Sequence, residues 1–304
     1  MQLYNDYNTY LKTKYGCKVY RIGLDAGFTC PNRDGTKGAG GCIFCNAEGS
    51  RANYANPNET IEKQLANRIA CLKASKGTTK FIAYFQAFTN TYAPPGELKS
   101  LYDRALAFSE IVGLSVGTRP DTVNAENARL LAGYMKHREV WLELGLQSIH
   151  DKTLEIIRRG HTFGDFLTAL ALAKRFGIPV SAHVILGLPH ETRDDMIRTA
   201  RTISNLKVDA VKIHLLHVLK GSPLERLHEE QRVKLLTREE YIEIVCDFLE
   251  NLAPGIIVQR LTGEGTRSNH IAPEWALDKM GTIAGIKETL KKRGTVQGYR
   301  FNDK

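Results

Sequence analysis

Six short apolar runs alternate along the chain with longer segments that have the pattern of helices. The runs lie at residues 18–25, 81–85, 113–117, 140–145, 179–186 and 210–216. Helices are predicted over about residues 60–75, 95–108, 125–135, 151–176, 192–205 and 238–251. Alternation of this kind predicts parallel strands joined by right-handed crossovers.

Polar side chains fall within or just beyond the ends of these runs, at Gln86, Arg119, Gln147, His183 and His214. A doubly wound open sheet has the same local pattern, so periodicity alone leaves that fold open. The carboxyl ends of barrel strands converge on one site, and the placement of the polar residues favours that arrangement. We therefore predict an α/β fold with a partial, six-stranded (βα)6 TIM-like barrel.

The predicted barrel occupies residues 1–220, and residues 221–304 form a C-terminal extension that closes its mouth, all within one structural domain. The hydrophobic fraction of 42% and the charged fraction of 25% are those of an ordinary globular protein. No run approaches the ~20 apolar residues needed to cross a bilayer. The first residues lack a basic start followed by an apolar core, so we expect no signal peptide and a cytoplasmic location.

The net charge of +9 comes from 42 Lys and Arg against 33 Asp and Glu. This balance favours an acidic partner, of which nucleic acid is the commonest, although nucleotides or phosphorylated metabolites also fit. The densest basic segment is Lys287–Arg293. It also fits the exposed last turn of a helix, where cations suit the helix dipole.

Three of the six cysteines lie in one glycine-rich loop within residues 26–46. Cys30 and Cys42 are separated by eleven residues, and Cys42 and Cys45 by two. Thiolates select iron–sulfur clusters, zinc or copper(I), but a structural zinc site has four protein ligands. Three cysteines on a loop that glycines allow to curl suit a four-iron four-sulfur cluster with one open iron.

Other interpretations of this loop remain open. A redox dithiol at Cys42 and Cys45 would leave Cys30 unexplained, and a zinc site would need a distant histidine such as His161 or His183. In a reducing compartment, clustered cysteines indicate metal ligands rather than disulfides. The remaining cysteines are far apart in the sequence, and we expect them to be ordinary buried or half-buried residues; they are Cys17, Cys71 and Cys246.

The three cysteines, followed by the barrel pattern, resemble the radical S-adenosylmethionine (SAM) enzymes. Most members space these cysteines by three and two, whereas the spacing of eleven and two resembles the YhcC/YtqA-type subgroup. That subgroup is related to the catalytic subunit of elongator, which modifies the wobble uridine of tRNA. Further similar motifs lie at residues 118–121, 143–148, 159–161 and 183–189, and the resemblance covers nearly the whole chain.

The resemblance implies cofactors and roles. Cys30, Cys42 and Cys45 would hold a [4Fe-4S] cluster whose open iron binds SAM. The family places other residues around SAM: Phe44 beside the adenine, Gln86 at the methionine amino group, Gln147 and His183 at the ribose, and Arg159 at the methionine carboxylate. An arginine suits the last position because its planar fork can bind a carboxylate through two hydrogen bonds.

Some positions depart from the family pattern or have simpler explanations. Gly117 stands where several relatives carry a ribose-binding glutamate, so Glu143 is an alternative for that role. His183 and His190 replace the ends of the family's strand-five motif. Glu143 and Gln147 also fit a role in satisfying backbone groups at the barrel end, and Arg159 fits a surface helix. His214 and His217 are expected to be packing or polar-layer residues.

Arg119 and Arg260 are candidate substrate contacts, and residues 261–266 form either a loop that closes the mouth or a plain surface turn.

The sequence is compatible with three functions. The first is a radical enzyme that acts on the 5-position side chain of a tRNA wobble uridine, with an electron donor such as flavodoxin or ferredoxin. The second is a radical enzyme that acts on a small metabolite or peptide. The third is a non-catalytic RNA-binding protein with structural zinc.

Overall fold

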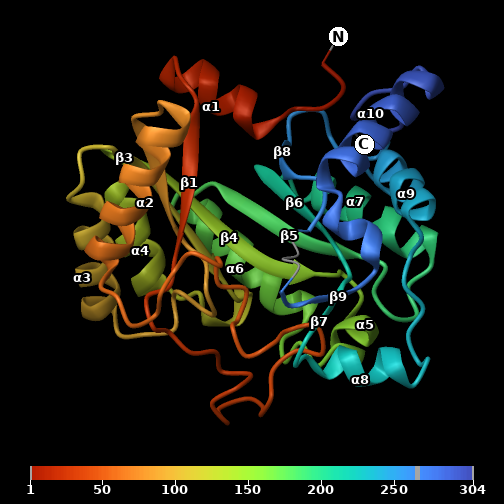
Figure 1. Cartoon of the computed structure of the whole chain (residues 1–304), viewed down its shortest axis with the longest axis horizontal. Helices are drawn as coiled ribbons and strands as arrows, with labels where there is room; N and C mark the ends of the chain where they lie inside the picture. The colour runs from red at the N-terminus through yellow and green to blue at the C-terminus, as the bar shows by residue number, and fades with distance from the viewer. Residues whose placement is uncertain (1, 264–267, 303–304) are drawn as a thin grey trace.

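Seven parallel strands form one curved sheet in the computed structural model, which describes residues 2–263 and 268–302. The strands are β1 (Val19–Leu24), β2 (Lys80–Phe85), β3 (Ile111–Thr118), β4 (Glu139–Gln147), β5 (Val180–Leu186), β6 (Ala210–Leu215) and β8 (Ile257–Arg260). Each strand except β8 pairs with the next along this order, so β1 and β8 are the two edges of a half-barrel (Figure 1). The predicted partial barrel is confirmed.

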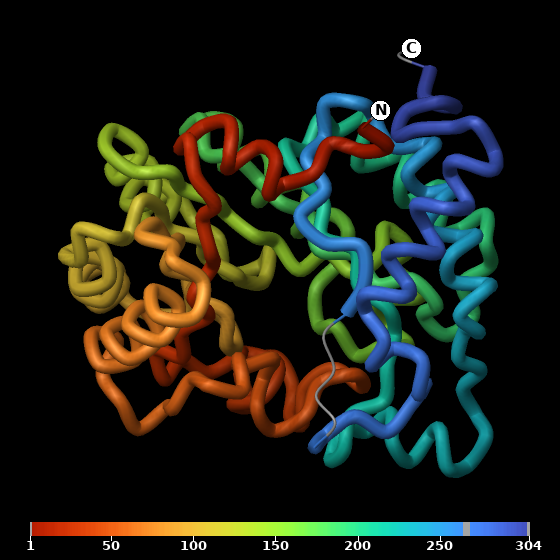
Figure 2. The backbone as a smooth tube through the Cα atoms, turned by 45° about the horizontal axis from the view of Figure 1, so that its top comes forward, coloured from red at the N-terminus to blue at the C-terminus, as the bar shows by residue number. Residues whose placement is uncertain are grey.

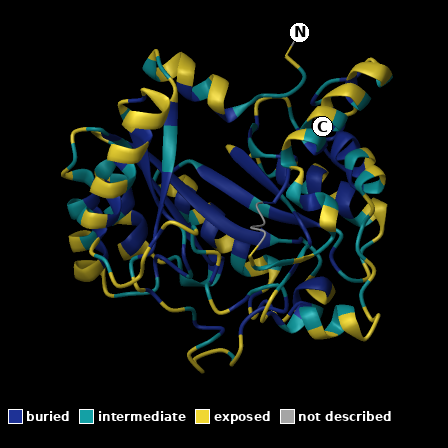
Figure 3. Cartoon of the chain, viewed as in Figure 1, coloured by how far each residue is buried: buried dark blue, intermediate teal, exposed yellow. Residues whose placement is uncertain are grey.

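Helices cover the outer face of the sheet, and their outward sides are exposed (Figure 3). They are α2 (Ile61–Lys76), α3 (Pro95–Leu106), α4 (Ala125–Tyr134), α6 (Phe163–Arg175), α7 (Arg193–Asn205) and α9 (Arg238–Glu250). The short helix α5 (Asp151–Ile156) instead packs through Leu154 in a second cluster with Ile43 and Ile185. Alternate strand residues such as Ile22, Leu24 and Phe85 point outward and form the main core with these helices. The space inside the half-barrel is therefore lined by the other set of strand residues.

Local sequence explains where several helices begin. Thr162, Thr192 and Thr237 each accept a hydrogen bond from the backbone N–H three residues later, and the residue there bonds back to the cap. Such capping boxes satisfy backbone donors that a helix start leaves without partners. The helix starts predicted at Thr192 and Arg238 agree with the structure to within one residue. The helical stretch predicted over residues 151–176 is divided into two helices, the second of which begins after Thr162.

The amino end of the half-barrel is closed by helix α1 (Tyr7–Tyr15). Its residues Tyr7 and Leu11 pack with Val19, Ile82 and Trp141 in an apolar cluster. The segment before α1 also joins the two sheet edges, because the backbone N–H of Val258 donates to the carbonyl of Asn5 at 2.7 Å. Figure 2 shows this segment and α1, both in red, running from the β8 side toward β1.

The structure contains elements that were not predicted. One is α1 near the N-terminus; the others are β7 (Val218–Leu219), which pairs antiparallel with β9 (His270–Ala272), α8 (Pro223–Glu229), β8 and the beginning of α10 (Lys279–Arg293). The end of α10 contains the basic segment Lys287–Arg293, which agrees with the helix end that the sequence allowed for it. Short 3-10 helices lie at Pro120–Thr122 and Glu274–Leu277. Because β8 joins the main sheet, the barrel has one more strand than predicted. The division into residues 1–220 and 221–304 stays a prediction. No described helix is long and apolar enough to cross a membrane.

Candidate active site

A cavity of about 1300 Å³ occupies the interior of the half-barrel and extends between the edge strands β1 and β8. It reaches the loop between β1 and α2, so that Cys30, Cys42 and Cys45 all line it. Every other residue predicted to bind cofactor or substrate lines the same cavity: Phe44, Gln86, Arg119, Glu143, Gln147, Arg159, His183 and Arg260. The fold thus brings together all the predicted site residues, while their individual roles stay predictions.

Glycines shape the cysteine loop in two different ways. Gly35, Gly40 and Gly41 have φ values of +91°, +83° and +81°, a backbone conformation that other residues rarely adopt. Gly38 instead lies against Asn32, because a Cβ on Gly38 would lie 2.8 Å from Oδ1 of that asparagine. The loop can therefore fold back on itself and direct its thiols into the cavity.

Hydrogen-bond donors surround two of the thiols. Nδ2 of Asn32 and Nη1 of Arg159 each lie 3.5 Å from Sγ of Cys42, and Nη2 of Arg33 lies 3.4 Å from Sγ of Cys45. Burial raises the pKa of the Cys45 thiol, and the Arg33 guanidinium opposes that shift. Donors and cations beside cysteine sulfurs stabilise thiolates and tune the potential of a cluster that they bind.

The histidines considered as zinc ligands are engaged elsewhere. Nε2 of His161 lies 3.1 Å from the carbonyl oxygen of Gly145, and Nε2 of His183 lies 2.8 Å from Oε2 of Glu143. Across residues 2–263 and 268–302, no three or more His, Cys, Asp or Glu side chains are arranged to hold one metal ion. Three thiols on one loop are one fewer than the four protein ligands that a structural zinc site uses.

The strands leave a hollow beside the thiols, and glycines at inward positions near their carboxyl ends make room for the side chains that enter it. A Cβ on Gly145 would lie 2.5 Å from Nη2 of Arg159, and one on Gly23 would lie 2.5 Å from Oε1 of Gln86. Gln147, at the end of β4, has a φ of +71°, which is uncommon for a residue other than glycine. Backbone strain of this kind is frequent at functional sites.

Arg159 and Arg119 hold the groups around Cys42 in place through hydrogen bonds to the protein. Nη2 of Arg159 donates to the carbonyl oxygen of Gly145 at 2.8 Å, which holds the guanidinium beside Cys42. Arg119 is buried, forms two hydrogen bonds of 2.9 and 3.0 Å with Asp121, and donates to the Arg159 carbonyl at 2.7 Å. Arg119 therefore contacts protein groups that position the site, and its predicted contact with substrate stays a prediction.

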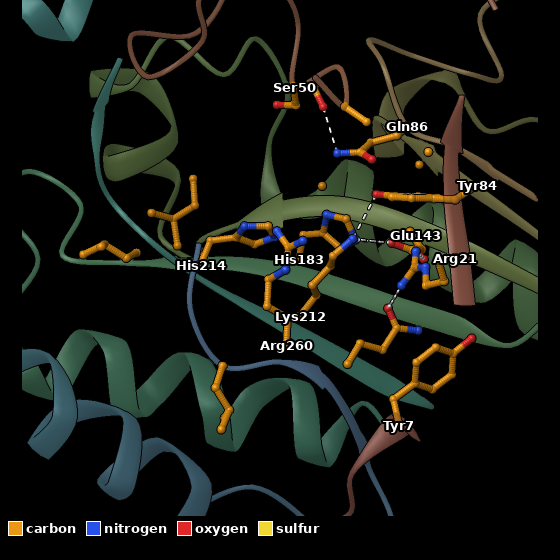
Figure 4. A pocket seen from close by; sticks show the side chains of 18 of the residues that line it. Tyr7, Arg21, Ser50, Tyr84, Gln86, Glu143, His183, Lys212, His214 and Arg260 are labelled. Carbon is orange, nitrogen blue, oxygen red and sulfur yellow. Dashed lines mark hydrogen bonds and ion pairs between the residues drawn. The ribbon is translucent and has the colours of Figure 1, made fainter. Parts of the chain in front are cut away.

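A buried charged layer lies across the inside of the half-barrel. Figure 4 shows Arg21, Glu143, His183 and Lys212 pointing toward one another. The Glu143 carboxylate is fully buried and accepts hydrogen bonds from Arg21 and from Nζ of Lys212, the latter at 3.1 Å. Lys212 also donates to the hydroxyl of Tyr84 at 3.0 Å. This layer separates the apolar amino end from the hollow beside the thiols.

The charges in this layer shift one another's pKa values. Burial would raise the pKa of Glu143, but Arg21 and Lys212 hold it well below its usual range, so this residue is an anion. Burial and the neighbouring cations Arg21 and Arg260 lower the pKa of Lys212. Burial and Lys212 lower the pKa of His183 to about 4. Because protein groups engage both oxygens of Glu143, its role as a ribose ligand remains a prediction.

Sequence reasoning missed several residues of the site, namely Arg21, Tyr84 and Lys212 in the charged layer and Asn32 and Arg33 beside the thiols. A signal for the first group exists. Each is a polar residue inside an otherwise apolar strand, with period-two spacing that turns it away from the outer core. Polar residues at such positions need buried partners.

The remaining predicted residues have mixed outcomes. Arg260 ends β8 and lines the cavity, and residues 264–266 of the predicted mouth loop lie outside the described residues. His214 and His217 also line the cavity. Cys246 is buried and Cys17 half-buried, as expected. The expectation for Cys71 was wrong, because it is exposed on α2, whose residues Ile61, Leu65, Ile69 and Leu72 face the core instead.

A curved parallel half-barrel with a three-cysteine loop at the carboxyl ends of its strands defines the radical SAM class of folds. The chain matches the Radical SAM superfamily over residues 32–203 and the Radical_SAM C-terminal domain over residues 208–292. It is 39% identical to YtqA of Bacillus subtilis (strain 168) over 98% of this chain and 92% of that protein. It is 38% identical to YhcC of Escherichia coli (strain K12) over 98% of this chain and 95% of that protein.

The chain therefore belongs to the radical SAM superfamily, and its cofactors are a [4Fe-4S] cluster and S-adenosylmethionine. Part of the chain is similar to the tRNA uridine(34) acetyltransferase of Methanocaldococcus jannaschii, with 32% identity over 44% of this chain and 25% of that protein. The archaeal Methanocaldococcus infernus Elp3 has a similar fold, with a TM-score of 0.69 and 19% identity over 92% of this chain and 64% of that one.

Proposed function

We propose that this radical SAM enzyme modifies the side chain at the 5-position of a wobble uridine in tRNA. The observation that carries the proposal is the set of three thiols on one loop that opens into a cavity of about 1300 Å³. Small-molecule pockets usually measure ~300–1,000 Å³, so this cavity has room for SAM together with part of a larger substrate. When bound, the cluster and SAM supply a 5′-deoxyadenosyl radical that removes a hydrogen atom from the substrate.

The chain's own residues bind and orient these groups. Cys30, Cys42 and Cys45 would hold the cluster, with donors from Asn32, Arg33 and Arg159 beside the sulfurs. The roles proposed for the residues around SAM are those given by the family pattern: Phe44 at the adenine, Gln86 at the amino group, Gln147, His183 and Glu143 at the ribose, and Arg159 at the carboxylate. The charged layer forms the floor of the cavity and fixes His183 through Glu143.

Two features support RNA as the substrate. The net charge of +9 favours a polyanion, and the partial relative from Methanocaldococcus jannaschii is named for uridine 34 of tRNA. Enzymes that act on a base usually take it out of its stack into a pocket, and proteins recognise RNA mainly through such splayed bases. A cavity that opens at the side of the barrel suits a base that enters from a larger molecule.

The proposal has further parts. We infer that the enzyme works in the cytoplasm with a small electron donor such as flavodoxin or ferredoxin. We also infer that residues 221–304 act as an extension that closes the mouth of the barrel formed by residues 1–220. Arg119 and Arg260 are retained as candidate contacts to the substrate.

Two measurements test the proposal. After anaerobic reconstitution, iron and 5′-deoxyadenosine are measured, and about four irons per chain with SAM-dependent 5′-deoxyadenosine are expected. Nucleosides of tRNA from cells that lack the protein are then compared by mass spectrometry with those from cells complemented by the wild type. A changed wobble uridine, restored by complementation, is expected. An unchanged profile from an enzyme that still cleaves SAM would reject tRNA and favour a small metabolite or peptide.

A further inference from the structure

One face of α10 borders the mouth of the cavity. Met280, Ile283, Lys287 and Lys291 all line the cavity, and their spacing of three, four and four residues places them on one side of the helix. Met280 is 75% exposed, which is the largest exposure among the exposed large hydrophobic residues of the described chain. The half-buried Ile283 and the exposed Met280 thus add apolar surface beside two exposed lysines at the edge of the cavity.

The two lysines on this face have no carboxylate partner among the described residues. Lys287 and Lys291 are exposed and appear in no ion pair there. Arg293, on the same helix, instead forms ion pairs with two acidic side chains of α9, Asp247 at 3.0 Å and Glu250 at 2.8 Å. Arg293 thus uses two acids of α9, while Glu288 on α10 itself is exposed and appears in no ion pair of the described chain. Lys287 and Lys291 therefore remain available to an outside partner.

A third cation also lines the cavity. Lys18, just before β1, is exposed and is among its lining residues. Acidic residues at the cavity edge are few: Asp6 caps helix α1, and Glu48 lies 3.7 Å from Nη2 of Arg51. The opening is therefore more positive than the protein average, and it is continuous with the space that the thiols line.

We propose that this face of α10 is a docking surface for the sugar–phosphate backbone of the RNA whose base enters the cavity. The inference rests on the proposed function. Lys287 and Lys291 lie one turn apart, or about 6 Å along the helix axis, a spacing similar to that of successive phosphates on an RNA strand. Met280 and Ile283 supply apolar contact for an unstacked base or a ribose.

The length of this face favours a polymer over a small metabolite. Met280 and Lys291 are separated by about 17 Å along the helix axis, which is longer than a single nucleotide. A phosphorylated metabolite held within the cavity would not contact both ends of this face. Each lysine that neutralises a phosphate releases a counterion, so the docking surface makes a specific prediction about salt dependence.

Adjacent lysines on the helix provide a matched test. Lys291 and Lys292 are both exposed on α10, but only Lys291 lines the cavity. Affinity for an RNA hairpin with the anticodon stem-loop sequence is measured by fluorescence anisotropy at several salt concentrations. We expect K287E and K291E each to weaken binding roughly 5-fold or more and to reduce the slope of log K against log salt by about 1. K292E should change binding by less than about 2-fold.

Substitution of Met280 separates apolar from ionic contact. Met280→Ala should weaken RNA binding by about 3-fold with no change in the salt slope, because it removes apolar contact only. Iron content and melting temperature of every reconstituted variant show whether the fold is intact. Equal losses in K291E and K292E, or wild-type affinity in both K287E and K291E, would overturn the docking surface and leave the proposed tRNA substrate standing. If the wild type itself fails to bind the hairpin, both proposals fail.

Discussion

The two ends of the half-barrel use the same strands for opposite purposes. At the amino end, Val19, Ile82 and Trp141 point inward and pack against Tyr7 and Leu11 of α1, which closes the opening with apolar side chains. At the carboxyl end, the inward positions of three strands are glycines, namely Gly23, Gly117 and Gly145. One end is therefore filled and the other is hollow.

The difference shows how one strand can contribute both stability and chemistry. Along β4, the inward residues change from Trp141 in the apolar cluster to Glu143 in the charged layer and then to Gly145 beneath the thiols. In barrels, the carboxyl end carries active sites, while the opposite end contributes mainly to stability. Substitutions at the two ends should accordingly change different measured properties.

The largest effect is expected at the hollow end. Cys42→Ala should remove a cluster ligand, so that reconstituted protein loses iron and forms 5′-deoxyadenosine only at the level of a control without enzyme. Its melting temperature before reconstitution should stay close to that of the wild type, because the change removes only one atom from a loop. Cys71→Ala, at an exposed position on α2, is the matched control and should behave as the wild type. Wild-type iron and product in Cys42→Ala would refute the assignment of the thiols.

Much of the fold could be predicted because six strands have strong apolar runs and several helices have clear caps. β8 escaped prediction because it has only four residues, two of which are Gln259 and Arg260. Its place in the sheet depends on contacts with β6 and with the segment at Asn5, far away in the sequence. Such an element has little local pattern and is defined by its neighbours.

The part of the candidate site that a local sequence motif marks could be predicted. The part that forms only when distant strands pair could not. The cysteine spacing identifies the loop from the sequence. The charged layer does not appear in any local motif, because Arg21 and Glu143 are 122 residues apart and Lys212 is 69 residues from Glu143. Only the register of β1, β4 and β6 brings these side chains into contact.

The next largest effect is expected at the filled end, on stability rather than chemistry. Leu11 is 1% exposed in the apolar cluster, and Leu11→Ala should lower the free energy of unfolding by about 3 kcal/mol through lost burial and a cavity. Iron content and 5′-deoxyadenosine formation per folded molecule should stay unchanged. Leu167→Ala makes the same chemical change at an exposed position on α6 and should cost less than ~1 kcal/mol. Loss of iron binding in Leu11→Ala would show that the two ends are coupled.

The charged layer between the two ends should give the smallest of these effects. Arg21→Leu removes one cation from a carboxylate that is fully buried. Breaking a buried ion pair often costs ~3–5 kcal/mol, but Glu143 keeps Lys212 at 3.1 Å and His183 at 2.8 Å. We therefore expect a loss of about 2 kcal/mol, measured by urea unfolding of the metal-free protein.

Arg104→Leu is the control for this change, because Arg104 pairs with Glu62 and their side chains are 39% and 43% exposed. Exposed ion pairs contribute ~1 kcal/mol or less, so its loss should be clearly smaller. Equal losses in the two variants would mean that the buried Arg21–Glu143 pair contributes no more to the free energy of unfolding than an exposed ion pair does. The layer would then be a solvated lining of the cavity, and the boundary between a filled and a hollow end would depend on the apolar cluster alone.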